Sequence, residues 1–342
     1  NLDLGTYPHV NKIKHEVEKT LNIVHEYKSK QMREIFGKLR ILSDIKVVNK
    51  FPILITGETG TGKTTVAEKF HEMRKIHENE DVPFVKVLCG EFDGNPNLAN
   101  STIFGHKKGA YTGADEDRIG MLQEADGGTV FFDEIANLPM STQNVLLDVI
   151  EGRPFRRLGS NDDITSDFQL ICATNSDIEE LVANRVLRGD FVARIDTVKF
   201  EIPPVRQRPD DIEGILEGLL KTSDFINFEI EIMAKKNLLS FLKKSYLKSN
   251  IRDIRTILVE LYFMSQEPPV HALTSSEVEK FFRENKEPTK DDEFIKSVGL
   301  LLNLWPNTSY AEAGEKWKEA LMQVAVKKLS ESPNFRKKDG EL

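Results

Sequence analysis

The chain has 342 residues, of which 39% are hydrophobic, enough for a sizeable core and for more than one domain. Its formal net charge of −8 argues against nucleic-acid binding by the chain as a whole. Two cysteines exclude a disulfide framework or a cysteine-based zinc site. Without a secretory leader or an apolar run of about 18 residues, we expect a cytoplasmic protein that does not enter a membrane.

The pattern of the chain changes near residue 51. Residues 12–42 are charged and carry apolar side chains at helical spacing, which favours a solvated linker helix. Five short apolar runs follow, rich in β-branched and aromatic residues and separated mostly by amphipathic segments: 51–57, 82–90, 128–134, 168–175 and 197–203. This alternation predicts an α/β fold in which helices flank both faces of a parallel five-stranded sheet.

Strand patterns stop after residue 203, and only helical patterns follow. Amphipathic segments at 209–222, 229–247, 250–266 and 274–285 predict an all-α lid subdomain, and a further helix is expected at about 310–331. We therefore expect four regions: an N-terminal linker (1–29), an α/β nucleotide-binding subdomain (30–205), the lid (206–285) and a C-terminal helical segment (286–342).

A phosphate-binding loop is the first chemical motif. "GETGTGKT" (57–64) follows the apolar run "ILIT" and opens an amphipathic helix, which is the context that G-x-x-x-x-G-K-[ST] requires. Backbone N–H groups freed by the glycines can surround phosphates at a helix N-terminus. Lys63 would reach the β- and γ-phosphates and Thr64 would bind Mg²⁺. The full set of predicted nucleotide contacts in the loop is Gly57, Glu58, Thr59, Gly60, Thr61, Gly62, Lys63, Thr64 and Thr65.

An acidic strand end completes this site. "TVFFDE" (129–134) places Asp133 at the carboxyl edge of the predicted sheet, where open α/β folds bind ligands. Asp133 would hold Mg²⁺ through water, and Glu134 would orient and polarise the attacking water. Acidic residues commonly end strands, so the motif is weak alone and strong beside the phosphate loop. Together the two motifs predict hydrolysis of a nucleoside triphosphate.

Further motifs resemble one family. "STIFGHKKGAYTGA" (101–114) is similar to the loop of AAA+ ATPases that activate sigma-54 RNA polymerase, which ends in G-A-F-T-G-A, with Tyr111 in place of phenylalanine. "LRGDFVARI" (187–195), "PPVRQRPDDI" (203–212) and "SNIRDI" (249–254) also resemble motifs of these bacterial activators. The resemblance covers about residues 30–285, and "ITSDFQLICATN" is most similar to the subfamily of RtcR-like regulators of RNA-repair operons.

The resemblance implies roles for further residues. Asn175 would be a polar sensor of the γ-phosphate, Arg252 a lid sensor, and Arg188 and Arg194 arginine fingers that reach a neighbouring protomer's nucleotide. It also implies ATP and Mg²⁺ as cofactors, a homo-oligomeric ring that is a hexamer in this family, and sigma-54 RNA polymerase as the partner. The partner-binding residues would be Gly109, Ala110, Tyr111, Thr112, Gly113 and Ala114.

Three features depart from the family. Leu88 stands where an asparagine usually couples the catalytic glutamate to the nucleotide state, and leucine cannot make that hydrogen bond. Thr64 stands where many members carry glutamate. Enhancer DNA is usually bound by a C-terminal helix-turn-helix, of which the tail supplies at most a first helix. Because the chain begins at Asn1 rather than methionine, we expect a fragment or a processed product.

Two other functions stay open at this point. One is an AAA+ ATPase that remodels a different protein or nucleic acid and uses the 105–114 loop as a pore contact. The other is a nucleotide-gated DNA-binding scaffold without turnover. The adenine pocket cannot be located by motif.

Overall fold

The computed structural model describes residues 27–44, 51–78, 82–92, 94–225, 228–265 and 272–284. The helix expected at about 310–331 and residues 12–26 of the helix expected within 12–42 therefore lie outside the described residues. The later part of that segment forms α2 (Lys30–Asp44), whose Met32, Phe36 and Leu39 are buried in the core, so the expectation of a solvated linker helix is wrong there. The described residues form two compact units, one within 1–226 and 242–254 and the other within 227–241 and 255–342. The boundaries expected near residues 30, 206 and 286 stay predictions.

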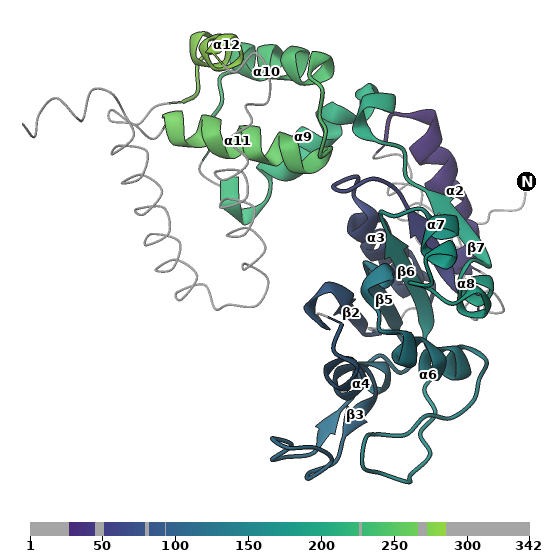
Figure 1. The fold of residues 1–342 in the computed structure, drawn as a ribbon. Helices are drawn as coiled ribbons and strands as arrows, with labels where there is room; N and C mark the ends of the chain where they lie inside the picture. The colour runs from purple at the N-terminus through teal and green to yellow at the C-terminus, as the bar shows by residue number, and fades with distance from the viewer. Residues whose placement is uncertain are drawn as a thin grey trace, which may run out of the picture. The chain divides into compact units, whose positions relative to one another are not determined.

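The first unit is built around the five predicted strands (Figure 1). They are β1 (Ile53–Thr56), β2 (Phe84–Leu88), β5 (Thr129–Asp133), β6 (Gln169–Thr174) and β7 (Val198–Glu201). All pair in parallel in the order β2-β5-β6-β1-β7, which confirms the predicted α/β class. The motif-bearing ends of β1, β5 and β6 thereby meet at one edge of the sheet, as ligand-binding open sheets require.

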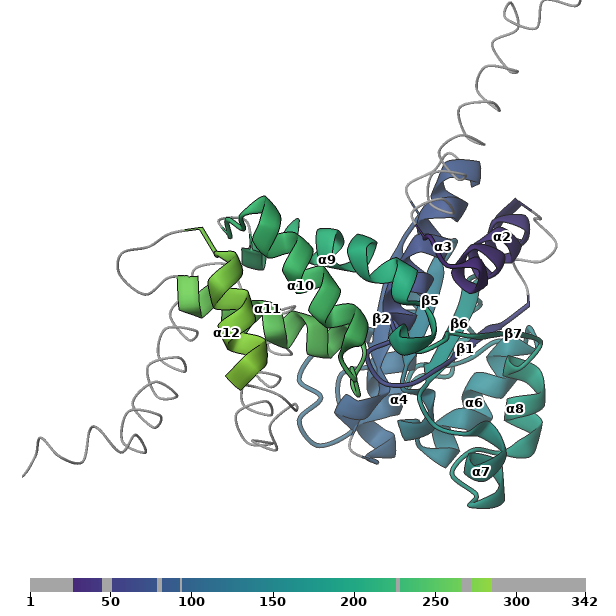
Figure 2. The ribbon, with the colours of Figure 1, turned by 90° about the horizontal axis from the view of Figure 1, so that it is seen from above.

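Helices cover both faces of the sheet, as Figure 2 shows. Along β5, Phe131 packs in a core cluster with α2 (Lys30–Asp44) and α3 (Lys63–Glu78). Its neighbours Val130 and Phe132 belong to the opposite cluster. This alternation follows from the two-residue repeat of a strand. The helices that contribute to that second cluster are α4 (Pro96–Phe104), α5 (Met121–Glu124), α6 (Met140–Ile150), α7 (Ile178–Ala183) and α8 (Gly189–Ile195).

A two-stranded antiparallel stem was not expected from the sequence. β3 (Gly105–His106) pairs with β4 (Arg118–Ile119), so the segment carrying GAYTGA is a loop on a stem. Gly105 has a φ of 88°, and a Cβ there would lie 2.6 Å from the Arg118 carbonyl oxygen. Only glycine fits this junction without displacing the stem.

The predicted helices after residue 203 are also present. They are α9 (Ile212–Leu220), α10 (Ile232–Lys244), α11 (Ile251–Ser265) and α12 (Ser275–Glu284), with short 3₁₀ turns at Val205–Gln207, Pro209–Asp211 and Ser223–Phe225. In the second unit, Phe241 stacks on Phe282 with ring centroids 4.6 Å apart. The first unit contains α9 and the first turn of α11, which matters for the site.

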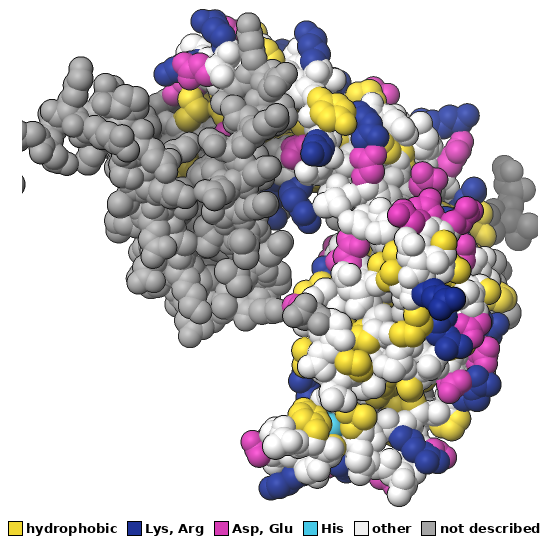
Figure 3. Space-filling view, viewed as in Figure 1, with side chains coloured by type: hydrophobic (Ala, Val, Ile, Leu, Met, Phe, Trp, Pro, Cys, Tyr) yellow, Lys and Arg dark blue, Asp and Glu magenta, His cyan; other side chains and the backbone are white. Residues whose placement is uncertain are grey.

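None of the helices in the described ranges is both long and apolar enough to span a bilayer. Figure 3 shows acidic and basic side chains interspersed on the face that it presents, with hydrophobic side chains between them. Both cysteines, Cys89 and Cys172, are free and buried, as expected, and burial raises the pKa of each thiol.

Candidate functional site

The phosphate loop joins β1 to α3 at the carboxyl edge of the sheet. Gly57, Gly60 and Gly62 have φ values of 151°, 75° and 98°. A Cβ at Gly60 would lie 2.1 Å from the Ser249 carbonyl oxygen, so another chain segment packs directly on the loop. The glycines are thus needed both for backbone conformation and for close approach.

Lys63 lies inside this loop. Its side chain is buried, and Nζ donates to the carbonyl oxygens of Gly57 and Glu58 at 2.9 and 3.2 Å. Burial lowers the pKa of Lys63, while the nearby carboxylates of Glu134 and Asp133 act to raise it. The ammonium is therefore held where the loop encloses space for a phosphate.

The acidic strand end lies beside the loop, as predicted. Thr64 Oγ1 donates to Asp133 Oδ2 at 3.3 Å, and Lys86 Nζ lies 3.2 Å from the same oxygen. Hydroxyl and carboxylate oxygens suit Mg²⁺, which takes one or two protein ligands and fills its other positions with phosphate oxygens and water. The described residues contain no cluster of three His, Cys, Asp or Glu ligands, which agrees with this sparse donor set. The residues present therefore fit a magnesium–nucleotide complex.

Glu134 follows Asp133 in a strained conformation. Its φ of 54° lies in the left-handed region, which a glutamate rarely adopts. Such strain costs of the order of 1–3 kcal/mol and tends to mark functional positions. Leu88 lies opposite Asp133 in the register of β2 and β5 and presents an apolar side chain there. An apolar side chain thus lies beside Asp133, and a changed coupling of Glu134 to the nucleotide state stays a prediction.

Asn175 comes directly after β6, next to β1. Its Nδ2 donates to Thr59 Oγ1 at 2.9 Å, which places the predicted sensor in contact with the phosphate loop. Its role as a sensor stays a prediction.

The turn before α11 holds the phosphate loop through contacts that the sequence reasoning missed. Asn250 is fully buried at a φ of 58°, and its Nδ2 donates to the Thr59 carbonyl at 3.0 Å and to Glu58 Oε2 at 3.2 Å. The two terminal guanidinium nitrogens of Arg206 donate to the two oxygens of the same carboxylate, at 2.7 and 2.5 Å. Both residues lie in motifs that resemble the family, Asn250 in "SNIRDI" and Arg206 in "PPVRQRPDDI". Their place in these motifs was the signal in the sequence that could have identified them.

Arg252 is the second residue of α11 and lies next to the phosphate loop. The Ile251 N–H donates to the Gly60 carbonyl at 2.9 Å, and a Cβ at Gly60 would lie 3.3 Å from Arg252 Cβ. Burial is the main cause of the lowered pKa of Lys63, and the positive charge of Arg252 acts in the same direction. The structure thus places the predicted lid sensor beside the phosphate loop.

A pocket of about 670 Å³ adjoins the phosphate loop within the first unit. Ligand pockets commonly have this size. Its walls come from the chain before α2, the start of α3, the turn before α9 and α9 itself, and include Tyr27, Met32, Thr65, Ile215 and Leu219. Tyr27 stacks on Phe36 with ring centroids 4.5 Å apart, which fixes one wall. No spacing rule links these segments, so no sequence motif indicates the pocket.

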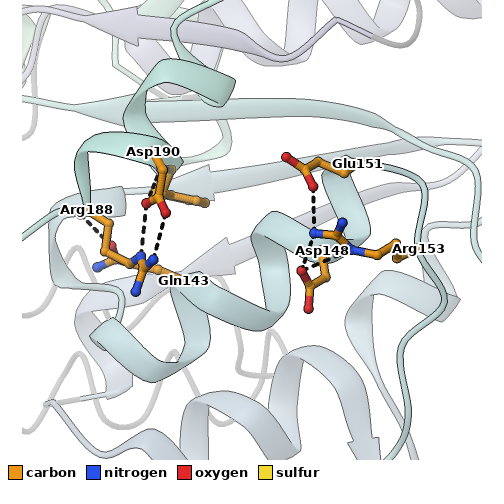
Figure 4. A network of polar contacts seen from close by, with 7 residues as sticks. Gln143, Asp148, Glu151, Arg153, Arg188 and Asp190 are labelled. Atoms are coloured by element: carbon orange, nitrogen blue, oxygen red, sulfur yellow. Dashed lines mark hydrogen bonds and ion pairs between the residues drawn. The ribbon is translucent and has the colours of Figure 1, made fainter.

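The two predicted finger arginines lie on and before α8, and the described residues show neither in contact with the phosphate loop. Arg188 forms a two-pronged ion pair with Asp190 at 2.9 and 2.7 Å, and its N–H donates to the buried Gln143 (Figure 4). The side chain of Arg194 is exposed and has no hydrogen bond or ion pair to the described part of the chain. The Arg194 guanidinium is thus exposed at the surface of the unit, and the Arg188 guanidinium is partly exposed but paired with Asp190.

The GAYTGA tip is a compact turn on the β3–β4 stem. The Gly109 N–H donates to the Ala114 carbonyl at 2.8 Å, and the Ala114 N–H donates to the Tyr111 carbonyl at 3.0 Å. The Tyr111 ring packs edge-on against buried His106 at 5.2 Å and remains 40% exposed. Ser101 Oγ lies 2.7 Å from His106 Nδ1 and 3.3 Å from the Tyr111 hydroxyl. Thr112 and Gly113 are exposed.

Known proteins share this combination of motifs. Residues 26–201 match the family described as the Sigma-54 interaction domain. The chain is 35% identical over 237 residues to the transcriptional regulatory protein RtcR of Escherichia coli (strain K12), which covers 68% of this chain and 44% of that protein. It is 34% identical over 226 residues to the Nif-specific regulatory protein of Herbaspirillum seropedicae, covering 66% of this chain and 40% of that protein. The chain thus spans less than half the length of these relatives.

A solved structure supports the fold. NtrX from Brucella abortus in complex with ADP superposes with a TM-score of 0.59 at 24% identity, over 79% of this chain and 59% of that one. Since the matched family region makes up more than half of the sequence, the chain belongs to the Sigma-54 interaction domain family, the AAA+ family of sigma-54-dependent transcriptional activators.

Proposed function

We propose that this chain is an ATP-hydrolysing activator that assembles into a ring and remodels sigma-54 RNA polymerase holoenzyme through the GAYTGA loop. The observation that carries the proposal is the pairing of two sites in one unit. A phosphate loop with Lys63, Thr64, Asp133 and Glu134 supports nucleotide hydrolysis, and a stem presents an exposed aromatic tip with no evident role in that chemistry. An idle surface loop would not need the stem, the buried His106 and the glycine-only junction.

The roles in catalysis follow from position and chemistry. Lys63 and the loop N–H groups would bind phosphate, and Thr64 and Asp133 would hold Mg²⁺, which neutralises phosphate charge when bound. Glu134 would orient water and accept its proton. Asn175 and Arg252, both next to the loop, would contact the γ-phosphate, and the adjoining pocket would take the base.

Arg188 and Arg194 would act on a neighbouring protomer's nucleotide. Their surface positions and the lack of contact with their own phosphate loop in the described residues support this assignment. Fingers supplied in trans require a closed ring, and a hexamer is the arrangement that the family resemblance implies. Such fingers contribute about 10³–10⁵ in rate in other NTPases.

Two substitutions test the proposal together. Glu134→Gln should abolish steady-state ATP hydrolysis while nucleotide binding persists, which would exclude a scaffold without turnover. Tyr111→Ala should leave hydrolysis intact and abolish sigma-54 engagement and transcription activation. Equal loss of both activities in Tyr111→Ala would mean that the loop is structural, and the proposal would fail.

The proposal also covers location and DNA. Action on RNA polymerase implies the cytoplasm. Enhancer DNA would be bound by a domain that the described residues do not include, so no DNA contact is assigned to them.

A further inference from the structure

Lys86 lies beside the carboxylate that the proposed function assigns to the metal. It is in β2, opposite Phe131 in the register with β5, and its Nζ lies 3.2 Å from Asp133 Oδ2. Strand alternation puts Lys86 and Leu88 on the sheet face that carries Phe131 and Asp133, which is the face covered by α3. The ammonium therefore lies among the groups around the metal position.

The immediate surroundings make Lys86 more than a surface lysine. Its Nζ is 5.9 Å from the centroid of the Phe131 ring, so the ring face adds a second attraction that holds the side chain inward. Its positive charge also opposes the rise that desolvation causes in the pKa of Glu68 on α3. The Asp133 carboxylate and an aromatic face thus lie next to the ammonium, and the charge of Lys86 also acts on Glu68.

One carboxylate oxygen has two side-chain partners. Asp133 Oδ2 accepts from Thr64 Oγ1 at 3.3 Å and pairs with Lys86. Asp133 is only 20% exposed, so its charge is poorly satisfied by water and the ammonium supplies the compensation. A hydrated Mg²⁺ held by Asp133 through water would compete with the ammonium for this oxygen and would be repelled by it at short range.

We propose that Lys86 is a positioning residue that holds Asp133 and competes with Mg²⁺ for it. Binding of the magnesium–nucleotide complex then requires the Lys86–Asp133 pair to open. The pair sets a higher Mg²⁺ requirement than the same site would have with a neutral side chain at position 86. This inference rests on the proposed function, because it assumes a magnesium–nucleotide site.

The test is a Mg²⁺ titration of fluorescent ADP binding, which does not depend on turnover. Lys86→Met and Lys86→Gln should lower the Mg²⁺ concentration for half-maximal binding roughly two- to fivefold, the range expected from a partly exposed ion pair. Lys86→Arg should keep the wild-type requirement because the positive charge remains. Lys199→Met, which removes an exposed charge from β7 at the other edge of the sheet, should leave the requirement unchanged.

The outcomes separate this inference from the proposed function. Binding of fluorescent ADP with an unchanged or higher Mg²⁺ requirement in both neutral variants would overturn the role of Lys86 and leave the proposed function standing. An equal shift in Lys199→Met would show a general charge effect and would also overturn it. Failure of the unsubstituted chain to bind nucleotide at any Mg²⁺ concentration would overturn both.

Discussion

At the scale of single residues, Tyr111 differs from phenylalanine by one hydroxyl group, which lies 3.3 Å from Ser101 Oγ. Tyr111→Phe keeps the edge-on contact with His106 and removes this one hydrogen bond. We expect the free energy of unfolding to fall by less than about 1 kcal/mol, because the group is half exposed. Sigma-54 binding should stay within about twofold of wild type, since the exposed ring supplies most of the contact area. A tenfold loss in a binding titration would show that the hydroxyl itself contacts the partner.

The contacts of Glu58 make the stability of the folded chain depend on pH. Hydrogen bonds from Arg206 and then Asn250 lower its pKa from the usual 4.5 to about 2. Because the folded-state pKa is depressed, the stabilisation is complete above about pH 4.5 and is lost as the pH falls towards 2. The pair is about 40% exposed, so we expect a contribution below about 1 kcal/mol.

Glu58→Gln measures this contribution. The difference in free energy of unfolding between wild type and Glu58→Gln, from urea titrations, should be largest near pH 6 and should shrink towards pH 3. A difference that does not change with pH would mean that the charge of the Glu58 carboxylate does not contribute to the free energy of unfolding.

At the scale of elements, the β3–β4 stem depends on Gly105. Gly105→Ala should destabilise the stem by about 2 kcal/mol or more, since strain and overlap with Arg118 add together. Gly152→Ala is the matched control, because Gly152 lies outside the stem and the tip and also has a positive φ, 82°, but no atom lies within 4 Å of its added Cβ. We expect Gly105→Ala to weaken sigma-54 binding and Gly152→Ala to leave it near wild type, with ATP hydrolysis near wild type in both. Equal effects would rule out the stem as a support for the tip.

The chain that enters α2 is tied to the phosphate loop through buried charges. Ser29 Oγ donates to Asp211 Oδ2 at 2.5 Å, and the N–H groups of Lys28 and Ser29 donate to Asp211 Oδ1, each at 2.7 Å. Arg208, almost fully buried beside Asp211, donates to the Thr61 carbonyl at 2.5 Å. The start of α2, the turn before α9 and the phosphate loop thus share one polar network.

Ser29→Ala should show the energetic weight of that network. A buried hydrogen bond to a carboxylate contributes about 1.5–3 kcal/mol, so we expect a loss in that range in urea unfolding. Ser43→Ala, in the last turn of α2, is the control: the Ser43 hydroxyl donates to the Arg40 carbonyl at 2.7 Å, and the change should cost less than about 1 kcal/mol. Similar losses in the two variants would mean that the Asp211 contact carries no special weight.

Some elements and site residues could be predicted from the sequence and others could not, and the difference has physical causes. Buried parallel strands leave unbroken apolar runs, so all five were found. The β3–β4 stem was missed because strands of two residues have no periodicity. The ends of three neighbouring strands meet at one edge of the sheet. The proximity of Lys63, Asp133 and Asn175, which lie at or shortly after these ends, could therefore be derived. Asn250, Arg206 and the pocket depend on contacts between distant segments, which single-sequence patterns do not encode.

At the scale of the whole molecule, the finger assignment makes a prediction about mixed assemblies. Glu134→Gln and Arg188→Ala should each be inactive alone, one lacking the base and the other the finger. Mixed in equal amounts, they should recover hydrolysis, because about a quarter of interfaces would join an intact base to an intact finger. ATPase assays across mixing ratios measure this, and activity no higher than the two separate proteins would refute fingers acting in trans.

Binding of the purified chain to sigma-54 in the presence of an ATP transition-state analogue such as ADP–aluminium fluoride tests the proposed function. An activator of sigma-54 RNA polymerase should form a stable complex on size-exclusion chromatography with the analogue, should form none with ADP, and should lose the complex in Tyr111→Ala. Absence of a complex in every nucleotide state, from a chain that hydrolyses ATP, would rule out this function and favour an AAA+ machine with a different target.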